Sequence, residues 1–200
     1  MKVFIAGPRA ISRLDKAILE RLRSICDKNC TVLVGDANGI DKAVQKFFFE
    51  AGYANVCVFV SGNTVRNNLG GWQVENVEVD KKLKGFAFYA QKDLAMATTA
   101  DYGFMIWNGE SKGTLNNIIN LIGGGKKVLV YLTPAKQFVS VGCKDELATL
   151  IAGCSAEARQ LYNELTAKEV QTETQTSLFS RSSEPSAETQ AFLHSANTAE

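Results

Sequence analysis

The most informative part of this chain for its fold is Tyr102-Gly103-Phe104-Met105-Ile106-Trp107-Asn108-Gly109-Glu110-Ser111-Lys112-Gly113-Thr114. Its first half, 102–107, is a continuous apolar run of strand length, and the apolar residues 115–122 that follow it are typical of a helix. The loop between them offers backbone N–H groups, a hydroxyl and a cation at the start of a helix, where phosphate commonly binds. Trp107 and Lys112 place a flat aromatic ring and a positive charge beside it. The stretch therefore predicts a strand, an anion-binding loop and a helix.

The same alternation occupies most of the chain. Apolar runs predict strands at 3–6, 31–34, 55–60, 102–107 and 127–132, and helical spacing predicts helices from 15, at 40–51, at 86–100 and at 115–122. Strands that alternate with helices predict an α/β fold, a Rossmann-like parallel sheet with helices on both faces. Ligands of such sheets bind outside the carboxyl ends of the strands, where the loops after 6, 34 and 107 meet.

Two segments depart from this rhythm. Residues 61–85 are rich in glycine and asparagine and contain an alternating piece at 72–79, which predicts an insertion with a short hairpin or an edge strand. Its apolar residues are a candidate interface for a homo-oligomer. We expect one ligand-binding domain at 1–133, a helical extension at 134–168 and a disordered acidic tail at 169–200, because the tail has few apolar residues.

The composition favours a cytoplasmic protein. The chain has 200 residues and a formal net charge of +1. This charge is unevenly distributed: five acidic residues and one basic residue follow position 168, so the tail is negative and the body carries about +5. A positive body suits a phosphorylated ligand. No apolar run approaches the roughly 20 residues that cross a membrane, and the first residues lack the layout of a signal peptide. The five cysteines have no framework spacing and the one histidine, His194, lies in the tail, so we expect neither a metal site nor a resident cofactor.

The first strand ends in Gly7-Pro8-Arg9. A glycine directly after a strand lets the backbone approach a ligand, and an arginine there can bind a phosphate or a carboxylate. A plain turn with an exposed arginine explains the same residues equally well.

The second strand ends in Gly35-Asp36-Ala37-Asn38-Gly39-Ile40-Asp41. Asp36 or Asn38 can cap the following helix, with Asp41 in its first turn. An acidic side chain at this place can also accept hydrogen bonds from ribose hydroxyls. Helix capping accounts well for one of these acidic residues and less well for the presence of both.

Two further polar features have ordinary explanations as well. Lys92 and Asp93 lie within a largely apolar helical stretch, and the pattern favours a solvated face for them. Gly113 and Thr114 can begin and cap a helix without a ligand. The loop at 108–114 lacks the Walker pattern, which disfavours ATP hydrolysis of that kind. The three glycines at 123–125 are typical of a helix end.

Taken together, these loops resemble the SLOG superfamily and, within it, the YspA/YpsA-like branch. The resemblance runs in order through Ile5 to Arg9, Gly35 to Asp41, Lys92-Asp93, Ala100-Asp101 and Ser111 to Thr114, over residues 1–133. It implies a Rossmann-like sheet and the binding or sensing of a nucleotide-derived molecule, such as a nucleotide or an ADP-ribose species. The ligand residues are then expected to be Gly7, Arg9, Gly35, Asp36, Gly39, Asp41, Ser111, Lys112, Gly113 and Thr114.

Related enzymes suggest an alternative, the cleavage of N-glycosidic bonds. The LOG-type phosphoribohydrolases and the nucleoside deoxyribosyltransferases use a glutamate shortly after the Gly-Thr turn, whereas this chain has Leu115, Asn116, Asn117 and Ile118 there. An amide cannot serve as nucleophile or general base at an anomeric carbon. A reaction would need Asp41, Asp93, Asp101 or Glu110 instead, so the departure favours binding over hydrolysis.

A third function is suggested by the tail. Its segment Gln175-Thr176-Ser177-Leu178-Phe179 resembles the peptide motif, with Gln175, Leu178 and Phe179 as its key positions, that bacterial sliding clamps bind in an apolar groove. Short motifs of this kind dock from disordered segments by becoming ordered on contact. Such a partner would place the protein near replication, in a phage or a mobile element.

Overall fold

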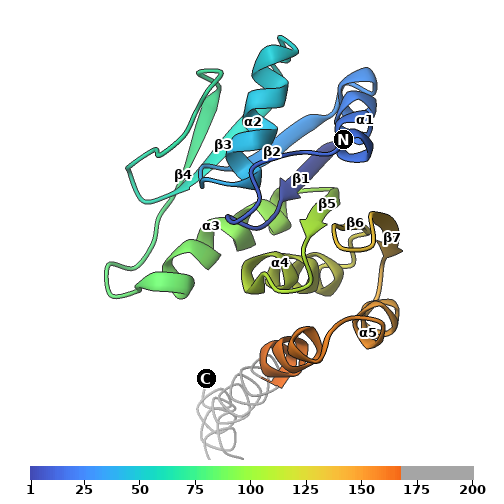
Figure 1. Ribbon diagram of the computed structural model, residues 1–200. Helices are drawn as coiled ribbons and strands as arrows, with labels where there is room; N and C mark the ends of the chain where they lie inside the picture. Colours follow the sequence, from blue (N-terminus) through green and yellow to red (C-terminus); the bar gives the residue numbers. More distant parts are fainter. Residues whose placement is uncertain (168–200) are drawn as a thin grey trace, which may run out of the picture. The chain divides into compact units, whose positions relative to one another are not determined.

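The computed structural model describes residues 1–167, and its centre is a seven-stranded sheet of order β4-β3-β2-β1-β5-β6-β7 (Figure 1). The strands are β1 (Lys2–Ala6), β2 (Thr31–Gly35), β3 (Val56–Ser61), β4 (Gln73–Val77), β5 (Tyr102–Trp107), β6 (Val128–Leu132) and β7 (Gln137–Val141). All neighbouring strands pair in parallel except β6 and β7, which are antiparallel. The predicted α/β fold with a mainly parallel sheet is confirmed.

Helices cover both faces of the sheet, as the alternation predicted. They are α1 (Lys16–Asp27), α2 (Ile40–Glu50), α3 (Gly85–Thr99), α4 (Lys112–Gly123) and α5 (Lys144–Ala152), and residues 156–167 are helical as well. The helices α1 and α2 lie on one face, and α3 and α4 lie on the other (Figure 1). Residues 1–159 form one compact unit, and the fold described here is that of this unit.

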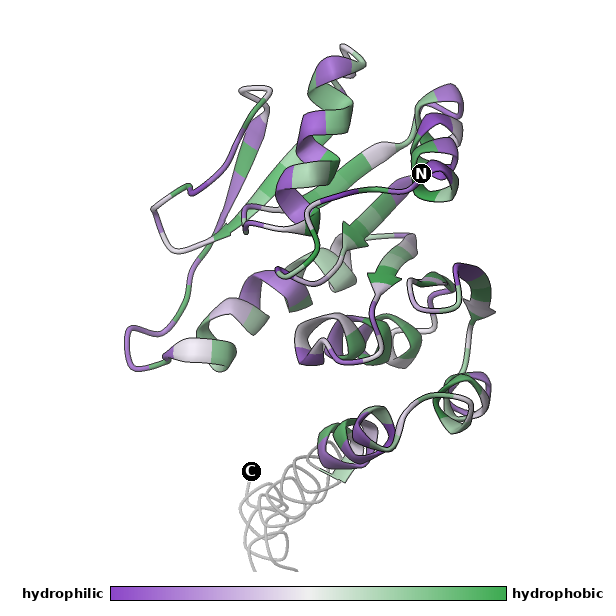
Figure 2. Cartoon of the chain, in the orientation of Figure 1, coloured by the Kyte–Doolittle hydropathy of each residue, from purple (hydrophilic) through white to green (hydrophobic). Residues whose placement is uncertain are grey.

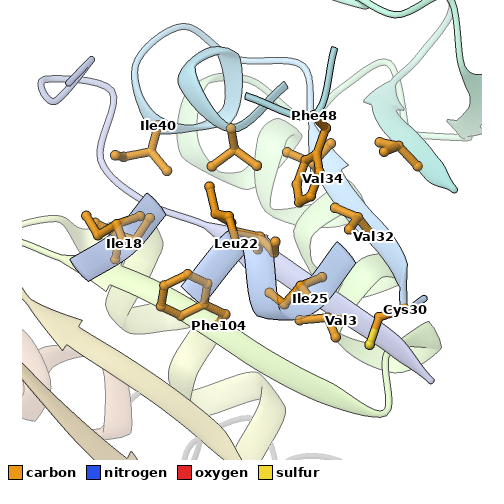
Figure 3. Packing of buried hydrophobic residues seen from close by; sticks show 14 of the residues in the cluster. Val3, Ile18, Leu22, Ile25, Cys30, Val32, Val34, Ile40, Phe48 and Phe104 are labelled. Atoms are coloured by element: carbon orange, nitrogen blue, oxygen red, sulfur yellow. The ribbon is translucent and has the colours of Figure 1, made fainter. Parts of the chain in front are cut away.

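The central strands are apolar on both sides because both faces of the sheet are covered. Figure 2 shows this as strands that are apolar along their length. On the face of α1 and α2, Ile18, Leu22 and Ile25 pack against residues of β1 and β2 such as Val3 and Val32 (Figure 3). Each fully buried side chain of this size contributes roughly 1.5–3 kcal/mol relative to an exposed one. This core holds the loops at the carboxyl ends of β1, β2 and β5 in fixed positions.

The strand order reverses between β1 and β5. The chain runs outward from β1 through β2, β3 and β4, and then returns to the other side of β1 as β5. The loops that follow β1 and β5 therefore leave the sheet in opposite directions and open a crevice between them. In open parallel sheets this switch point is where ligands bind.

The segment at 61–85 contains an edge strand, β4, which is one of the two expected alternatives, and it pairs in parallel with β3 after a connection without a helix at 62–72. One boundary differs from the sequence expectation. The strand β7 pairs with β6, so the sheet extends to Val141 and past the expected domain end at residue 133. An apolar run as short as 138–141 carries too little signal to show which sheet it joins.

Several expectations concern residues outside the described range. The tail at 169–200, with the motif residues Gln175, Leu178 and Phe179, lies beyond residue 167. Within residues 1–167, no helix has the length and apolar character needed to cross a membrane.

Candidate functional site

A cavity of about 470 Å³ lies at the switch point, at the carboxyl edge of the sheet. Its size falls within the range of small-molecule sites. Three predicted loops and the helix α3 enclose it. It is lined by Ala6, Gly7, Arg9, Ala37, Asp41, Gly85, Phe86, Tyr89, Ala90, Lys92, Asp93, Met96, Ser111, Gly113, Thr114 and Asn117. The structure thus brings together residues from positions 6 to 117, including six of the ten expected ligand residues.

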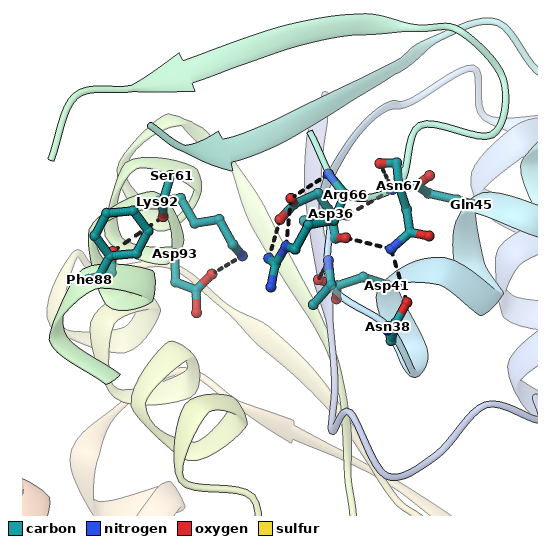
Figure 4. Close-up of polar contacts among 12 residues, drawn as sticks. Asp36, Asn38, Asp41, Gln45, Ser61, Arg66, Asn67, Phe88, Lys92 and Asp93 are labelled. Atoms are coloured by element: carbon teal, nitrogen blue, oxygen red, sulfur yellow. Dashed lines mark hydrogen bonds and ion pairs between the residues drawn. The ribbon is translucent and has the colours of Figure 1, made fainter. Parts of the chain in front are cut away.

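The polar residues of α3 form part of the cavity wall and are not a solvated face. Lys92 is 4% exposed, and its Nζ donates to Asp93 Oδ1 at 2.6 Å (Figure 4). Burial lowers the pKa of the Lys92 ammonium, but Asp93 and Asp41 oppose burial more strongly, so this pKa is raised. The expectation from the helical pattern is wrong here because carboxylates from two elements surround the ammonium.

Asp41 is the second acidic residue of the cavity. Its Oδ2 accepts a hydrogen bond from the backbone N–H of Ala37 at 3.2 Å. Burial raises the pKa of Asp41 to about 6, with Lys92 opposing this shift and Asp93 adding to it. The close approach depends on Gly35, since a Cβ there would lie 2.4 Å from Asp41 Oδ2 and 2.7 Å from Lys92 Nζ. Gly35 therefore makes room for the charged cluster and does not line the cavity itself.

Asp36 has a structural partner. Its buried carboxylate pairs with the guanidinium of Arg66, whose Nε donates at 2.8 Å, and also accepts the Arg66 backbone N–H at 3.2 Å (Figure 4). Burial raises the pKa of Asp36, but the hydrogen bonds and the charge of Arg66 together lower it by more than burial raises it. The pKa of Asp36 therefore lies below its usual value. Asn67 adds a hydrogen bond to the Asp36 carbonyl at 2.7 Å. Asp36 thus holds the 62–72 connection and lies outside the cavity lining. The helix α2 is capped by Gly39 without a side-chain hydrogen bond, so neither Asp36 nor Asn38 caps it.

Two arginines lie over one aromatic ring of the cavity wall, Tyr89, and of these two only Arg9 is in the cavity lining. The Cζ atoms of Arg9 and Arg66 lie 4.7 Å and 4.8 Å from the centroid of the Tyr89 ring, within the range of cation–π attraction. Gly39 positions Arg9, because its φ is +83° and a Cβ there would lie 2.4 Å from the Arg9 carbonyl oxygen. Gly7 has a similar packing role, since a Cβ there would lie 2.8 Å from the Ile106 carbonyl oxygen.

The N-terminus of α4 forms another part of the wall. Ser111 is its N-cap, with its Oγ accepting from the Thr114 N–H at 3.3 Å and the Thr114 hydroxyl at 2.9 Å. The expected cap by Gly113 or Thr114 is therefore wrong by two or three positions. Gly113 lines the cavity, and apart from its two chain neighbours and the adjacent backbone of α4, no heavy atom of the described residues lies within 4 Å of an added Cβ there. The first backbone N–H groups of a helix and its dipole attract an anion at such a place.

Two expected contributors to this anion site lie elsewhere. Lys112 is absent from the cavity lining, and its Nζ is 5.3 Å from the centroid of the Phe86 ring. Trp107 is fully buried, and its Nε1 donates to the Ser111 carbonyl at 3.2 Å. The Trp107 ring is therefore part of the core, and its hydrogen bond holds the end of the 108–111 loop.

The acidic candidates are separated by the fold. Asp41 and Asp93 line the cavity, but Asp101 precedes β5 at the opposite edge of the sheet and accepts from the Lys2 N–H at 2.8 Å. Glu110 is exposed and lies outside the lining. Within residues 1–167, no group of three or more histidine, cysteine or acidic side chains is placed to hold a metal ion.

Four contributors were missed by the sequence reasoning, namely Arg66, Phe86, Tyr89 and Asn117. Arg66 lies in a connection without periodicity, so nothing in the sequence brings it to Asp36. The sequence pattern predicts no binding role for Phe86 and Tyr89, although the alternation of aromatic with small residues in α3 is a weak sign of a helix that faces a cavity. Asn117 is one of the four residues, 115–118, that stand where related enzymes have a glutamate, and the pattern predicts no binding role for it either.

No family model matches the chain, and no curated protein matches it in sequence. The fold has a solved counterpart. DNA processing protein A from Helicobacter pylori is similar with a TM-score of 0.53 and 11% identity, over 84% of this chain and 81% of that chain. The report of that structure describes a single-stranded DNA binding mode for that protein. At this identity the likeness shows the fold alone, a Rossmann-like α/β arrangement.

Proposed function

We propose that the cavity binds a small nucleotide-derived molecule, such as a nucleotide or an ADP-ribose species. The observation that carries this proposal is one cavity at the switch point that joins an arginine, a helix N-terminus, two aromatic rings and a buried acidic cluster. Each of these features suits one part of a nucleotide. The kinship with the SLOG superfamily that the loops suggest is part of the same proposal.

The phosphate would bind between Arg9 and the start of α4. Arg9 is exposed and lines the cavity, so its guanidinium can reach an anion without breaking a buried contact. Gly113 leaves open space at the helix start, where backbone N–H groups and the helix dipole favour negative charge. Among the described residues, no carboxylate lies at hydrogen-bond distance from the Arg9 guanidinium or from the start of α4.

The other parts of the ligand follow from this placement. Tyr89 and Phe86 present rings at the rim, against which a base can stack. Asp41 and Asp93 lie on the wall beyond them, where carboxylates can accept hydrogen bonds from a sugar. Residues 115–118, where related hydrolases have a glutamate, contain no carboxylate, so binding or sensing is favoured over cleavage of the glycosidic bond.

A second candidate is the binding of single-stranded DNA, which one observation favours. The guanidinium groups of Arg9 and Arg66 lie over the Tyr89 ring, and the exposed Phe86 is on the same helix. Combinations of cations and aromatic rings bind single strands by phosphate contact and base stacking. The fold is also shared with a protein reported to bind single-stranded DNA. The volume of the cavity, about 470 Å³, suits a single nucleotide better than a strand.

The test is a calorimetric titration of the full chain with nucleoside monophosphates, ADP-ribose, NAD and a single-stranded oligonucleotide. Each mixture is then analysed for released base. Arg9→Ala should weaken the binding of a phosphorylated ligand about tenfold, because it removes one charge-assisted contact. Arg13→Ala is the matched control, since Arg13 is exposed and lies outside the cavity lining.

The outcomes separate the candidates. Binding of a mononucleotide that Arg9→Ala weakens and Arg13→Ala does not supports the proposal. Binding of the oligonucleotide alone would support the second candidate and contradict the first. Release of base would make the protein an enzyme despite the amide at Asn117.

A further inference from the structure

The cavity contains one buried polar atom without a partner, Asn117 Oδ1. Asn117 is 3% exposed, lies on α4 one turn after Gly113, and lines the cavity. Its Oδ1 has no hydrogen-bond partner among the described residues. A buried acceptor without a donor costs free energy of folding, so native proteins rarely keep one without a function. An unsatisfied acceptor in a cavity wall indicates a ligand that brings the donor.

The neighbouring groups show what kind of donor this is. Asp41 and Asp93 line the same cavity, and carboxylates accept hydrogen bonds. The one buried cation among the described lining residues, Lys92, donates at 2.6 Å to Asp93. The Asn117 oxygen, Asp41 and Asp93 thus give the cavity wall several acceptors, whereas Arg9 and the start of α4 carry positive features.

A pentose with free hydroxyls fits this asymmetry. Vicinal hydroxyls present several O–H donors at once and can satisfy an amide oxygen and a carboxylate together. A base presents its donors in the plane of a ring, and the rings that can stack with it, Tyr89 and Phe86, belong to α3. The sugar would then lie between the base and the phosphate site, opposite Asn117.

We propose that Asn117 selects a ribonucleotide over its 2′-deoxy counterpart, by accepting a hydrogen bond from a ribose hydroxyl at Oδ1. This inference rests on the proposed nucleotide site and adds the class of sugar. A site built to bond a hydroxyl rejects an analogue that lacks it, because the buried acceptor is then left unpaired. We expect the ribonucleotide to bind about tenfold more tightly or better.

The experiment titrates the full chain with AMP, GMP, CMP and UMP and with their four 2′-deoxy counterparts. The same eight titrations are made with Asn117→Leu, which replaces the amide by a branched apolar side chain, and with Asn117→Ala, which removes it without added volume. In both variants the preference for ribonucleotides should disappear. Asn116→Leu is the matched control, since Asn116 is the adjacent amide on α4 but lies outside the cavity lining.

The melting temperature without ligand is a second readout, and for Asn117→Leu it should rise while the preference for ribonucleotides is lost. Without ligand, Asn117→Leu should raise the melting temperature, because it removes an unpaired buried acceptor and adds apolar volume. A purely structural asparagine with satisfied hydrogen bonds would instead lower it when replaced. Asn117→Asp keeps an acceptor at the same place, and it should keep the preference for ribonucleotides even if it lowers stability.

The results distinguish this inference from the function on which it rests. A preference for ribonucleotides that Asn117→Leu and Asn117→Ala abolish, together with a higher melting temperature of Asn117→Leu, supports the inference. Equal binding of all eight molecules by the unaltered protein leaves the nucleotide site standing and overturns the role of Asn117. A preference that survives both variants overturns it as well. If none of the eight molecules binds, the role of Asn117 is overturned, and the proposed function fails as well when ADP-ribose and NAD do not bind either.

Discussion

Lys92 and Asp93, neighbours in sequence on α3, form a buried ion pair in which Nζ and Oδ1 are 2.6 Å apart and the side chains are 5% and 18% exposed. Adjacent residues of a helix point in different directions, so such pairs do not normally face each other. The long stem of Lys92 allows it, and the same ammonium also approaches Gly35 at the end of β2. One buried cation thus serves two carboxylates, Asp93 and Asp41.

This arrangement predicts that Lys92→Met destabilises the protein in a pH-dependent way. At about pH 7.5 the variant lacks the cation that stabilises the carboxylates of Asp41 and Asp93 in the unaltered protein, and breaking a buried pair in this way costs roughly 3–5 kcal/mol. At about pH 5, below the pKa of about 6 of Asp41, one of these carboxylates is protonated and the loss should be smaller. Denaturant unfolding at the two pH values measures the difference. Lys42→Met, at an exposed position of α2, is the control. An equal loss at both pH values would contradict the coupling of Lys92 to Asp41.

Asp41 itself should impose a pH dependence on stability. Its pKa is about 6 in the folded state and ordinarily 3.8, so between these values the folded state binds more protons than the unfolded state. The stability contributed by protonated Asp41 is therefore present below pH 3.8 and declines as the pH rises through about 6. The full decline is about 3 kcal/mol.

The measurement compares unfolding free energies of Asp41→Asn and the unaltered protein across this window. The amide of the variant cannot ionise, so Asp41→Asn should lose the decline while keeping an oxygen for the Ala37 N–H. Asp27→Asn, at an exposed position, should leave the profile unchanged. A profile of Asp41→Asn that parallels that of the unaltered protein would show that Asp41 titrates normally.

The pair of Arg66 and Asp36 should stabilise the fold far more than an exposed pair does. Arg66→Ala leaves the Asp36 carboxylate, 2% exposed, without its cation and releases the 62–72 connection, at a cost of about 2–3 kcal/mol. Lys16→Ala removes a pair with Glu20 whose side chains are 90% and 58% exposed, and it should cost less than about 0.5 kcal/mol.

The effect of Arg66→Ala also has a defined pH dependence. The pKa of Asp36 is lowered in the folded state, so its stabilising pair with Arg66 is present above pH 3.8 and is lost as the pH falls through the folded value. The difference between Arg66→Ala and the unaltered protein should therefore narrow in acid. Thermal unfolding at neutral and acidic pH tests this, and a constant difference would assign the loss to the loop alone.

The sequence was sufficient for the central strands of the sheet and for the position of the cavity at its carboxyl edge. Apolar runs of strand length followed by helical spacing predict parallel strands, and parallel strands bring the ends of β1, β2 and β5 to one edge whatever the details of packing. Gly7, Arg9 and Ser111 could therefore be placed at one site from the order of the elements alone.

The charged and polar interior could not be predicted in the same way. Burial of Lys92 depends on carboxylates from α2 and α3 meeting at Gly35, whereas a lysine in a helix is ordinarily solvated. Arg66 reaches Asp36 from a connection that has no periodicity. Both relationships are tertiary, and local pattern carries no information about them.

The last prediction concerns the phosphate site at the start of α4 and uses two glycines of the same helix. Gly113 lines the cavity and Gly123 is the last residue of α4. At both positions an added Cβ meets no heavy atom of the described residues within 4 Å, apart from the chain neighbours and the adjacent backbone of α4. Alanine is a better helix former than glycine by up to about 1 kcal/mol, so neither Gly113→Ala nor Gly123→Ala should destabilise the protein.

Their effects on binding should differ. The methyl group of Gly113→Ala occupies space that a phosphate needs to approach the helix N–H groups, and we expect nucleotide affinity to fall about tenfold. Gly123→Ala should bind as the unaltered protein does. Calorimetric titration with the same nucleotide, next to melting temperatures of both variants, makes the comparison. If Gly113→Ala binds undiminished while remaining folded, the anion is not held by α4, and Arg9 alone would have to account for phosphate recognition.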